Sequence, residues 1–181
     1  MNRLKLGAKT GLHLSLLVIF LSSIFLVSGC TPPPDEPAIP PEVQDEFLAW
    51  ARPLYKQIER SDVNWLHLSK AVVFYVDDEE DQETVEKLTR ESILLHQELL
   101  EEVDTASDNE EELIISELSA VLFEARLKAC HEIMDYLDSD EKPDMESSVF
   151  IDIRESTKNL ATTFQDIMKE YEVVWAHLKH Y

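Results

Sequence analysis

Two runs of acidic residues are the densest groups of chemically active side chains in the sequence. The run from Asp77 to Glu83 holds six carboxylates in seven residues, and the run from Asp135 to Glu146 holds six in twelve. Carboxylate oxygens bind Ca²⁺ and other hard cations and attract basic proteins, although no loop spacing here defines a cation site. A solvated surface that aids solubility explains the same runs. The candidate residues for binding a basic partner or a cation are Asp77, Asp78, Glu79, Glu80, Asp81, Glu83, Asp138, Asp140 and Glu141.

Histidine and cysteine form no motif that indicates a metal site or a catalytic site. HExxH and the Glu-x-x-His pattern of di-iron bundles are both absent from the sequence. His177 and His180 are three residues apart, which suits a transition metal, but histidines are also favourable at the negative end of a helix dipole. Cys130 and His131 would point about 100° apart on a helix, so we expect Cys130 to be a structural residue. The sequence predicts no catalytic residues, no metal ligands and no cofactor, and we expect a protein that is not an enzyme.

The N-terminus has the three parts of an export signal. Residues 1–10 are basic, residues 12–27 are almost wholly apolar, and Val27-Ser28-Gly29-Cys30 places small residues before a cysteine. These last four residues resemble the lipobox of bacterial prolipoproteins. The resemblance implies that residues 1–29 are a signal peptide and that Cys30 receives the lipid. An uncut membrane helix is the alternative, because the apolar stretch approaches the length that spans a bilayer.

The residue after the lipobox cysteine helps to predict which membrane holds the lipid. Thr31 stands where many inner-membrane lipoproteins of enteric bacteria have Asp. The resemblance therefore implies a lipid-anchored protein of the cell envelope, in the outer membrane and facing the periplasm or the surface if the cell has two membranes.

Composition excludes several classes of function. The chain has 16 Lys and Arg against 37 Asp and Glu, a net charge of −21, which argues against nucleic acid as a partner. All three glycines precede Cys30, so the body lacks every nucleotide-binding and nucleophile motif that requires glycine. The acidity has a second explanation, which is adaptation of the whole organism to salt.

Residues 31–41, TPPPDEPAIPP, hold six prolines in eleven positions. Such a segment favours extended polyproline II and cannot form a helix or a sheet ladder. With Cys30 it forms a predicted tether over 30–41, between the signal peptide and a body over 42–181.

Apolar residues in the body recur at helical spacing. The pattern predicts helices over 42–76, 82–104 and 109–138, and a last helix whose heptad seam runs from Phe150 to Tyr181. Four such segments with short polar connections predict an all-α fold, an antiparallel up-down-up-down four-helix bundle. The alternative is that these apolar seams pack against other chains in an oligomer. In an up-down bundle the two acidic runs share the end opposite the tether.

Three local signals refine the helix boundaries. Ser107 to Glu110 fits a capping box at the third helix. Pro143 suits the first turn of the fourth helix. Pro53 falls inside the first helix and predicts a kink, or a separate short helix over 42–52.

The sequence thus favours a membrane-anchored envelope lipoprotein that acts by protein–protein interaction, as an adaptor, anchor or assembly factor. Small helical pilotin lipoproteins of secretion systems are similar in general build, and their resemblance implies a helix-binding groove. The expected contacts are the membrane through the lipid, and one protein partner. A helical bundle that binds a small ligand or a metal cation is the alternative.

Overall fold

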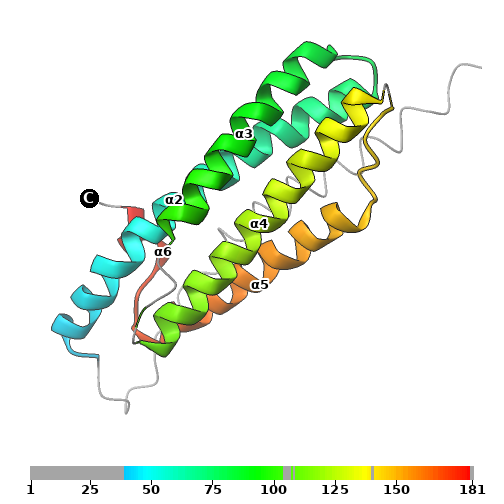
Figure 1. Cartoon of the computed structure of the whole chain (residues 1–181). Coiled ribbons are helices and arrows are strands. Elements are labelled where there is room, and N and C mark those ends of the chain that lie inside the picture. The colour runs from blue at the N-terminus through cyan, green and yellow to red at the C-terminus, as the bar shows by residue number, and fades with distance from the viewer. Residues whose placement is uncertain (1–38, 104–106, 108, 140, 180–181) are drawn as a thin grey trace, which may run out of the picture. The chain divides into compact units, whose positions relative to one another are not determined.

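The structure of this protein is a computed structural model that describes residues 39–103, 107, 109–139 and 141–179 (Figure 1). The predicted signal peptide, the lipobox with Cys30 and the tether up to residue 38 lie outside the described residues. The described helices belong to one unit, Ala38–Tyr181.

Every regular element among the described residues is a helix, which confirms the all-α prediction. The helices are α2 (Pro41–Val76), α3 (Gln82–Glu102), α4 (Glu110–Asp138), α5 (Ser148–Glu170) and α6 (Trp175–Lys179). The first three lie within two residues of the predicted ranges. Among the residues that the structure describes, no helix combines the length and the apolar character needed to cross a membrane.

Short polar side chains start two of the helices. The Asp81 carboxylate accepts a hydrogen bond of 2.8 Å from the backbone N–H of Thr84 and caps α3. Asn109 caps α4 by accepting from the N–H groups of Glu111 and Glu112. The predicted capping box is therefore displaced, because Ser107 instead accepts from the N–H of Asn109.

Pro53 does not divide the first helix. α2 continues through it for 36 residues, and the Pro53 side chain is exposed. The carbonyl of Ala49 that loses its hydrogen-bond donor belongs to another exposed residue, where water can replace the donor. The prediction of a separate helix over 42–52 is wrong.

The last predicted helix is shorter than the heptad pattern suggests. α5 begins at Ser148 rather than near Pro143, which lies buried in the connection, and it ends at Glu170. Glu172 then takes a positive φ of 54°, a conformation that costs a non-glycine residue roughly 1 kcal/mol. The turn brings Trp175 of α6 against Tyr55, with ring centroids 5.8 Å apart.

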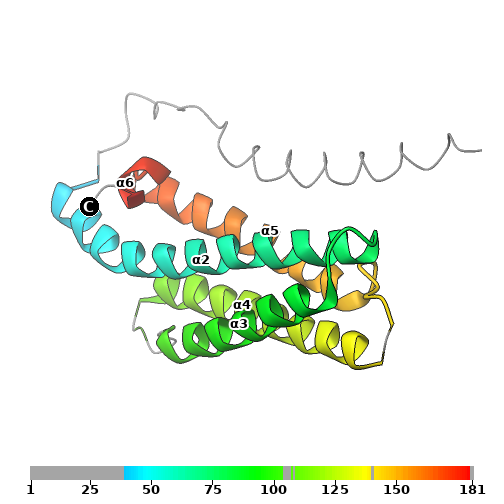
Figure 2. The same ribbon diagram turned by 90° about the horizontal axis from the view of Figure 1, so that it is seen from above.

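α3 packs against α2 and α4, α5 packs against α4, and α6 packs against α2. Figure 2 shows α3 and α4 lying side by side below α2 and α5. Aromatic side chains pack between α2 and α5. The ring centroids of Trp65 and Phe150, for example, lie 6.1 Å apart. A continuous hydrophobic core joins the helices. Its largest fully buried side chains include Phe123, Phe164, Leu68, Leu99, Ile115, Leu122 and Ile133.

Candidate functional site

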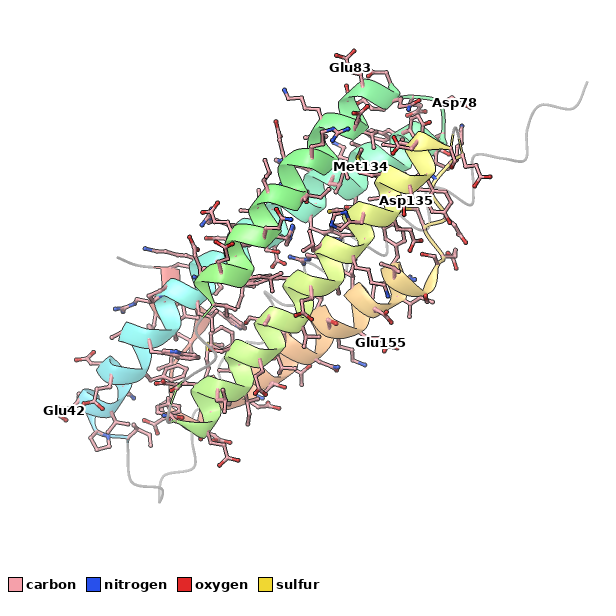
Figure 3. All side chains as sticks on the ribbon, viewed as in Figure 1. Glu42, Asp78, Glu83, Met134, Asp135 and Glu155 are labelled. Carbon is pink, nitrogen blue, oxygen red and sulfur yellow. The ribbon has the colours of Figure 1, made fainter. Side chains whose placement is uncertain are left out.

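The connection between α2 and α3 and the connection between α4 and α5 meet at one end of the helical unit. Lys142 Nζ donates to the carbonyl of Val76 at 2.8 Å and pairs with the Asp78 carboxylate at 2.5 Å. Gln82 Nε2 donates to the carbonyl of Leu137 at 3.1 Å. Figure 3 shows Asp78 and Glu83 at this end and Glu42 at the opposite end. We call residues 77–83 and 135–146 the acidic tip.

Most of the predicted binding residues in the acidic tip are exposed. Asp78 has a φ of 62°, a left-handed conformation that Asp tolerates better than most residues. Asp81 is occupied as the cap of α3, and Asp140 lies outside the described residues. Among the described part of the chain, no group of three or more His, Cys, Asp or Glu side chains is arranged to hold a metal ion. The exposed members are Asp77, Asp78, Glu79, Asp81, Glu83, Asp138 and Glu141, and Glu80 is half-buried.

The opposite end of the unit also carries carboxylates that hold the chain together. Tyr171 Oη donates to Glu111 Oε2 at 2.5 Å, and this hydrogen bond is the main reason that the pKa of Tyr171 is raised. The Tyr171 ring stacks on Phe47 with centroids 4.3 Å apart. Acidic side chains therefore serve local packing at both ends, and acidity alone does not single out the tip.

A second polar region lies inside the helical unit, between α2, α3 and α4. Three of its residues come from α2, two from α3 and two from α4, and together we call them the polar layer. Four of them are at most 2 % exposed, although their side chains are polar or charged. The polar layer consists of Ser61, Asp62, Asn64, Ser92, His96, Arg126 and Cys130.

The hydrogen bonds of His96 define its protonation state. His96 Nδ1 lies 2.8 Å from the carbonyl oxygen of Ser92, which can only accept, so Nδ1 carries the proton. His96 Nε2 lies 2.8 Å from Ser61 Oγ and accepts from that hydroxyl. Burial, together with the positive charge of Arg126, lowers the pKa of His96 to about 4, against a hydrogen bond to Ser92 that raises it. The imidazole is neutral in the folded protein at neutral pH.

Arg126 extends from α4 to two adjacent residues of α2. Its Nη1 donates to Ser61 Oγ at 2.5 Å, and its Nη2 donates to Asp62 Oδ1 at 2.6 Å. Only 3 % of its side chain is exposed, against 40 % of the Asp62 side chain. Burial lowers the pKa of Arg126, and Asp62 opposes that effect. The Nε of Arg126 has no hydrogen-bond partner in the described structure, so the polar layer is not fully satisfied.

The Ser92 hydroxyl links the interior to the surface, because it donates to Asn64 Oδ1 at 2.5 Å and Asn64 is half-buried. Cys130 lies fully buried next to Ser92, which agrees with the structural role expected for it, while His131 is exposed. Burial raises the pKa of the Cys130 thiol to about 11, although a hydrogen bond with Ser92 opposes the shift. This thiol is protonated and unreactive in the folded protein.

Ser61 and His96 have the spacing of a nucleophile and its general base. Both side chains are fully buried, and the Ser61 oxygen already accepts a hydrogen bond from Arg126. A substrate cannot reach this oxygen while α2, α3 and α4 remain packed. In this arrangement the hydrogen bond between Ser61 and His96 connects α2 to α3.

Sequence reasoning did not find the polar layer. Ser92 lies at a repeat position of the predicted second helix, and Arg126 belongs to no motif in the sequence. A helical projection would have placed Arg126 on the same face as Phe123 and Cys130, within the apolar stripe of the third helix. A charged residue at such a position is the one available signal of a buried polar contact.

A shallow groove between α2 and α3 lies beside the polar layer. We call it the α2–α3 groove, and its lining consists of Glu59, Arg60, Val63, Asn64, His67 and Leu95. Asn64 belongs to both regions. Several apolar side chains on the outer faces of α2 and α3 are exposed, with Val63 at 50 %, Leu66 at 39 % and Leu94 at 68 %.

Comparison with protein-family models, with curated proteins and with solved structures finds no match to this chain.

Proposed function

We propose that the protein is an envelope lipoprotein that acts by protein–protein interaction, as an adaptor, anchor or assembly factor. Cys30 carries the lipid, residues 31–41 hold the body away from the membrane, and the body is an up-down-up-down four-helix bundle. The lipid lies in the outer membrane where the cell has one, and the body faces the periplasm or the surface.

The α2–α3 groove is the single observation that supports an interaction surface best. Val63 and Leu95 give it apolar character, while Glu59, Arg60 and His67 surround them with polar groups. Apolar side chains bordered by polar residues are a common feature of protein interfaces. A groove between two helices suits an amphipathic helix that lays its apolar face into it.

The acidic tip bears on which kind of protein binds, and the α2–α3 groove bears on where it binds. Its exposed carboxylates, with Lys142 paired to Asp78, raise the association rate of a basic protein and repel acidic ones. A groove that supplies apolar contact and a tip that supplies charge attraction are compatible on one molecule.

Photo-crosslinking in the native cell tests the interaction. A photoreactive residue at position 63, in the groove, is compared with one at position 121 on α4, because Val63 and Val121 are similarly exposed, at 50 % and 48 %. We expect one dominant protein cross-linked from position 63 and not from position 121. Equal cross-linking from both positions, or none from either, would contradict the proposal.

The lipid anchor has its own test. In Cys30→Ala the acceptor thiol is lost, and we expect an unprocessed precursor without lipid in metabolic labelling. Ser28 and Gly29 are unchanged in this variant, so a mutant that is still cut and lipidated would overturn the proposed anchor.

A further inference from the structure

α3 has the fewest fully buried apolar residues of the four long helices. Its buried residues are Val85, Thr89, Ser92, His96 and Leu99, and three of these five are polar. Apolar burial is the main source of helix-packing stability. Polar bonds therefore make up a large part of the contact between α3 and α2.

Two hydrogen bonds of the polar layer join α3 to α2. His96 Nε2 accepts from Ser61, and the Ser92 hydroxyl donates to Asn64. Outside them, Arg60 of α2 pairs with Glu98 at 3.0 Å and with Glu102 at 3.5 Å, both on α3. These outer pairs are well exposed and contribute little.

A proton on His96 is incompatible with the hydrogen bonds that the structure shows. With Nε2 protonated, the imidazolium and the Arg126 guanidinium would both donate to the one oxygen of Ser61, and the Ser61 proton would have to turn away. Two buried positive charges would then face each other across one hydroxyl. Within the described part of the chain, Asp62 of α2 is the one carboxylate bonded to this pair, and it already binds Arg126.

The other groups around His96 offer no compensation. Cys130 of α4 is a neutral thiol, the Phe123 ring of α4 lies 6.4 Å from the imidazole between centroids, and Ser92 is the neighbour on the same helix. We propose that the polar layer is an acid-sensitive contact, in which proton uptake by His96 breaks its bond with Ser61, sets two buried positive charges against each other and lets α3 separate from α2. This inference is independent of any partner protein.

Hydrogen exchange on the full chain, purified in detergent, tests the proposal. Exchange within residues 82–102 is measured at about pH 7.5 and about pH 5 and corrected for the intrinsic rate at each pH. His96→Gln keeps an acceptor for Ser61 but does not titrate, and His67→Gln removes an exposed histidine as the matched control. Residues of α5 are the internal reference.

The expected size follows from the two states of His96. When α3 is open, His96 has its ordinary pKa of 6.5, whereas its pKa is about 4 in the closed state. Acidification from about pH 7.5 to about pH 5 therefore raises the population of the open state about 30-fold. We expect that increase in α3 in the wild type and in His67→Gln, and its absence in His96→Gln. An equal increase in His96→Gln, or an increase of the same size in α5, would overturn the proposal.

A second measurement decides the matter if His96→Gln does not fold. The ring nitrogen shifts of His96 in the wild-type protein are followed by NMR through the same pH range. We expect Nδ1–H and an unprotonated Nε2 to persist to about pH 5. A ring that titrates with the ordinary histidine pKa would refute the acid-sensitive contact.

Discussion

The acidic tip and the polar layer are both built from polar side chains, but they differ in their access to water. The tip carboxylates stay hydrated, as with Asp78, whose side chain is 85 % exposed in its pair with Lys142. The side chains of Ser61, Ser92, His96 and Arg126 have almost no access to water. A hydrated group loses little when its partner is removed, whereas a buried one keeps its desolvation cost without compensation.

The largest expected effect comes from Asp62→Ala, which leaves the Arg126 charge buried and unpaired. We expect the free energy of unfolding to fall by about 3 kcal/mol, toward the lower end for a broken buried pair because Asp62 is itself partly exposed. Urea unfolding followed by circular dichroism measures the change.

The double variant Asp62→Ala/Arg126→Met separates lost charge balance from lost packing. Met replaces the guanidinium by an apolar chain, and we expect stability within about 1 kcal/mol of the wild type. If the double variant is no more stable than Asp62→Ala, the cost does not come from the unpaired charge.

The pH dependence of stability is an effect of similar size. The pKa of His96 is about 4 in the folded protein and 6.5 ordinarily, so the unfolded chain binds more protons between these values. The contribution of neutral His96 to the free energy of unfolding is fully present above about pH 6.5. The free energy of unfolding falls by about 3 kcal/mol as the pH drops to about 4. The difference between wild type and His96→Gln in urea unfolding isolates this contribution from the surface carboxylates, and parallel pH profiles would show that His96 makes none.

Ser92→Ala tests a single neutral bond of the polar layer. It removes the donor to Asn64 and the polar neighbour of Cys130, and Asn64 can turn to water in the α2–α3 groove. We expect a loss of about 1 kcal/mol in the free energy of unfolding. Ser69→Ala, which removes an exposed hydroxyl on α2, is the control, and an equal loss there would remove the distinction.

The smallest expected effect belongs to the acidic tip. Asp78→Asn removes the charge that pairs with Lys142 and leaves its second bond, to the Val76 carbonyl, intact. We expect a change below about 0.5 kcal/mol, further reduced by salt. A loss comparable to that of Asp62→Ala would mean that exposure does not separate the two regions.

Much of the helical architecture was predictable because it depends on local periodicity. α2, α3 and α4 begin and end close to the predicted residues, where Asp81 and Asn109 supply caps. The end of the last helix was not predictable. The heptad pattern continues past Glu170, but the chain turns at Glu172 so that Trp175 packs against Phe164 and against Tyr55, which is far away in sequence.

The candidate site divides in the same way. Contiguous carboxylates revealed the acidic tip, although the sequence could not show that Asp81 is used as a cap or that Lys142 joins the two runs. Ser61 and His96 are 35 residues apart, and His96 and Arg126 are 30 residues apart. Only the position of Arg126 within an apolar stripe hints at a buried contact, and its partners cannot be read from the sequence.

The sequence by itself determined the helices, their polar connections and the acidic surface, because these depend on neighbours within a few turns and on exposure to water. Only the tertiary structure decided which polar side chains lose their water and which partners replace it. Helix packing brings Arg126 to Asp62 and His96 to Ser61. Their protonation and their energetic cost follow from that burial, which no single helix contains.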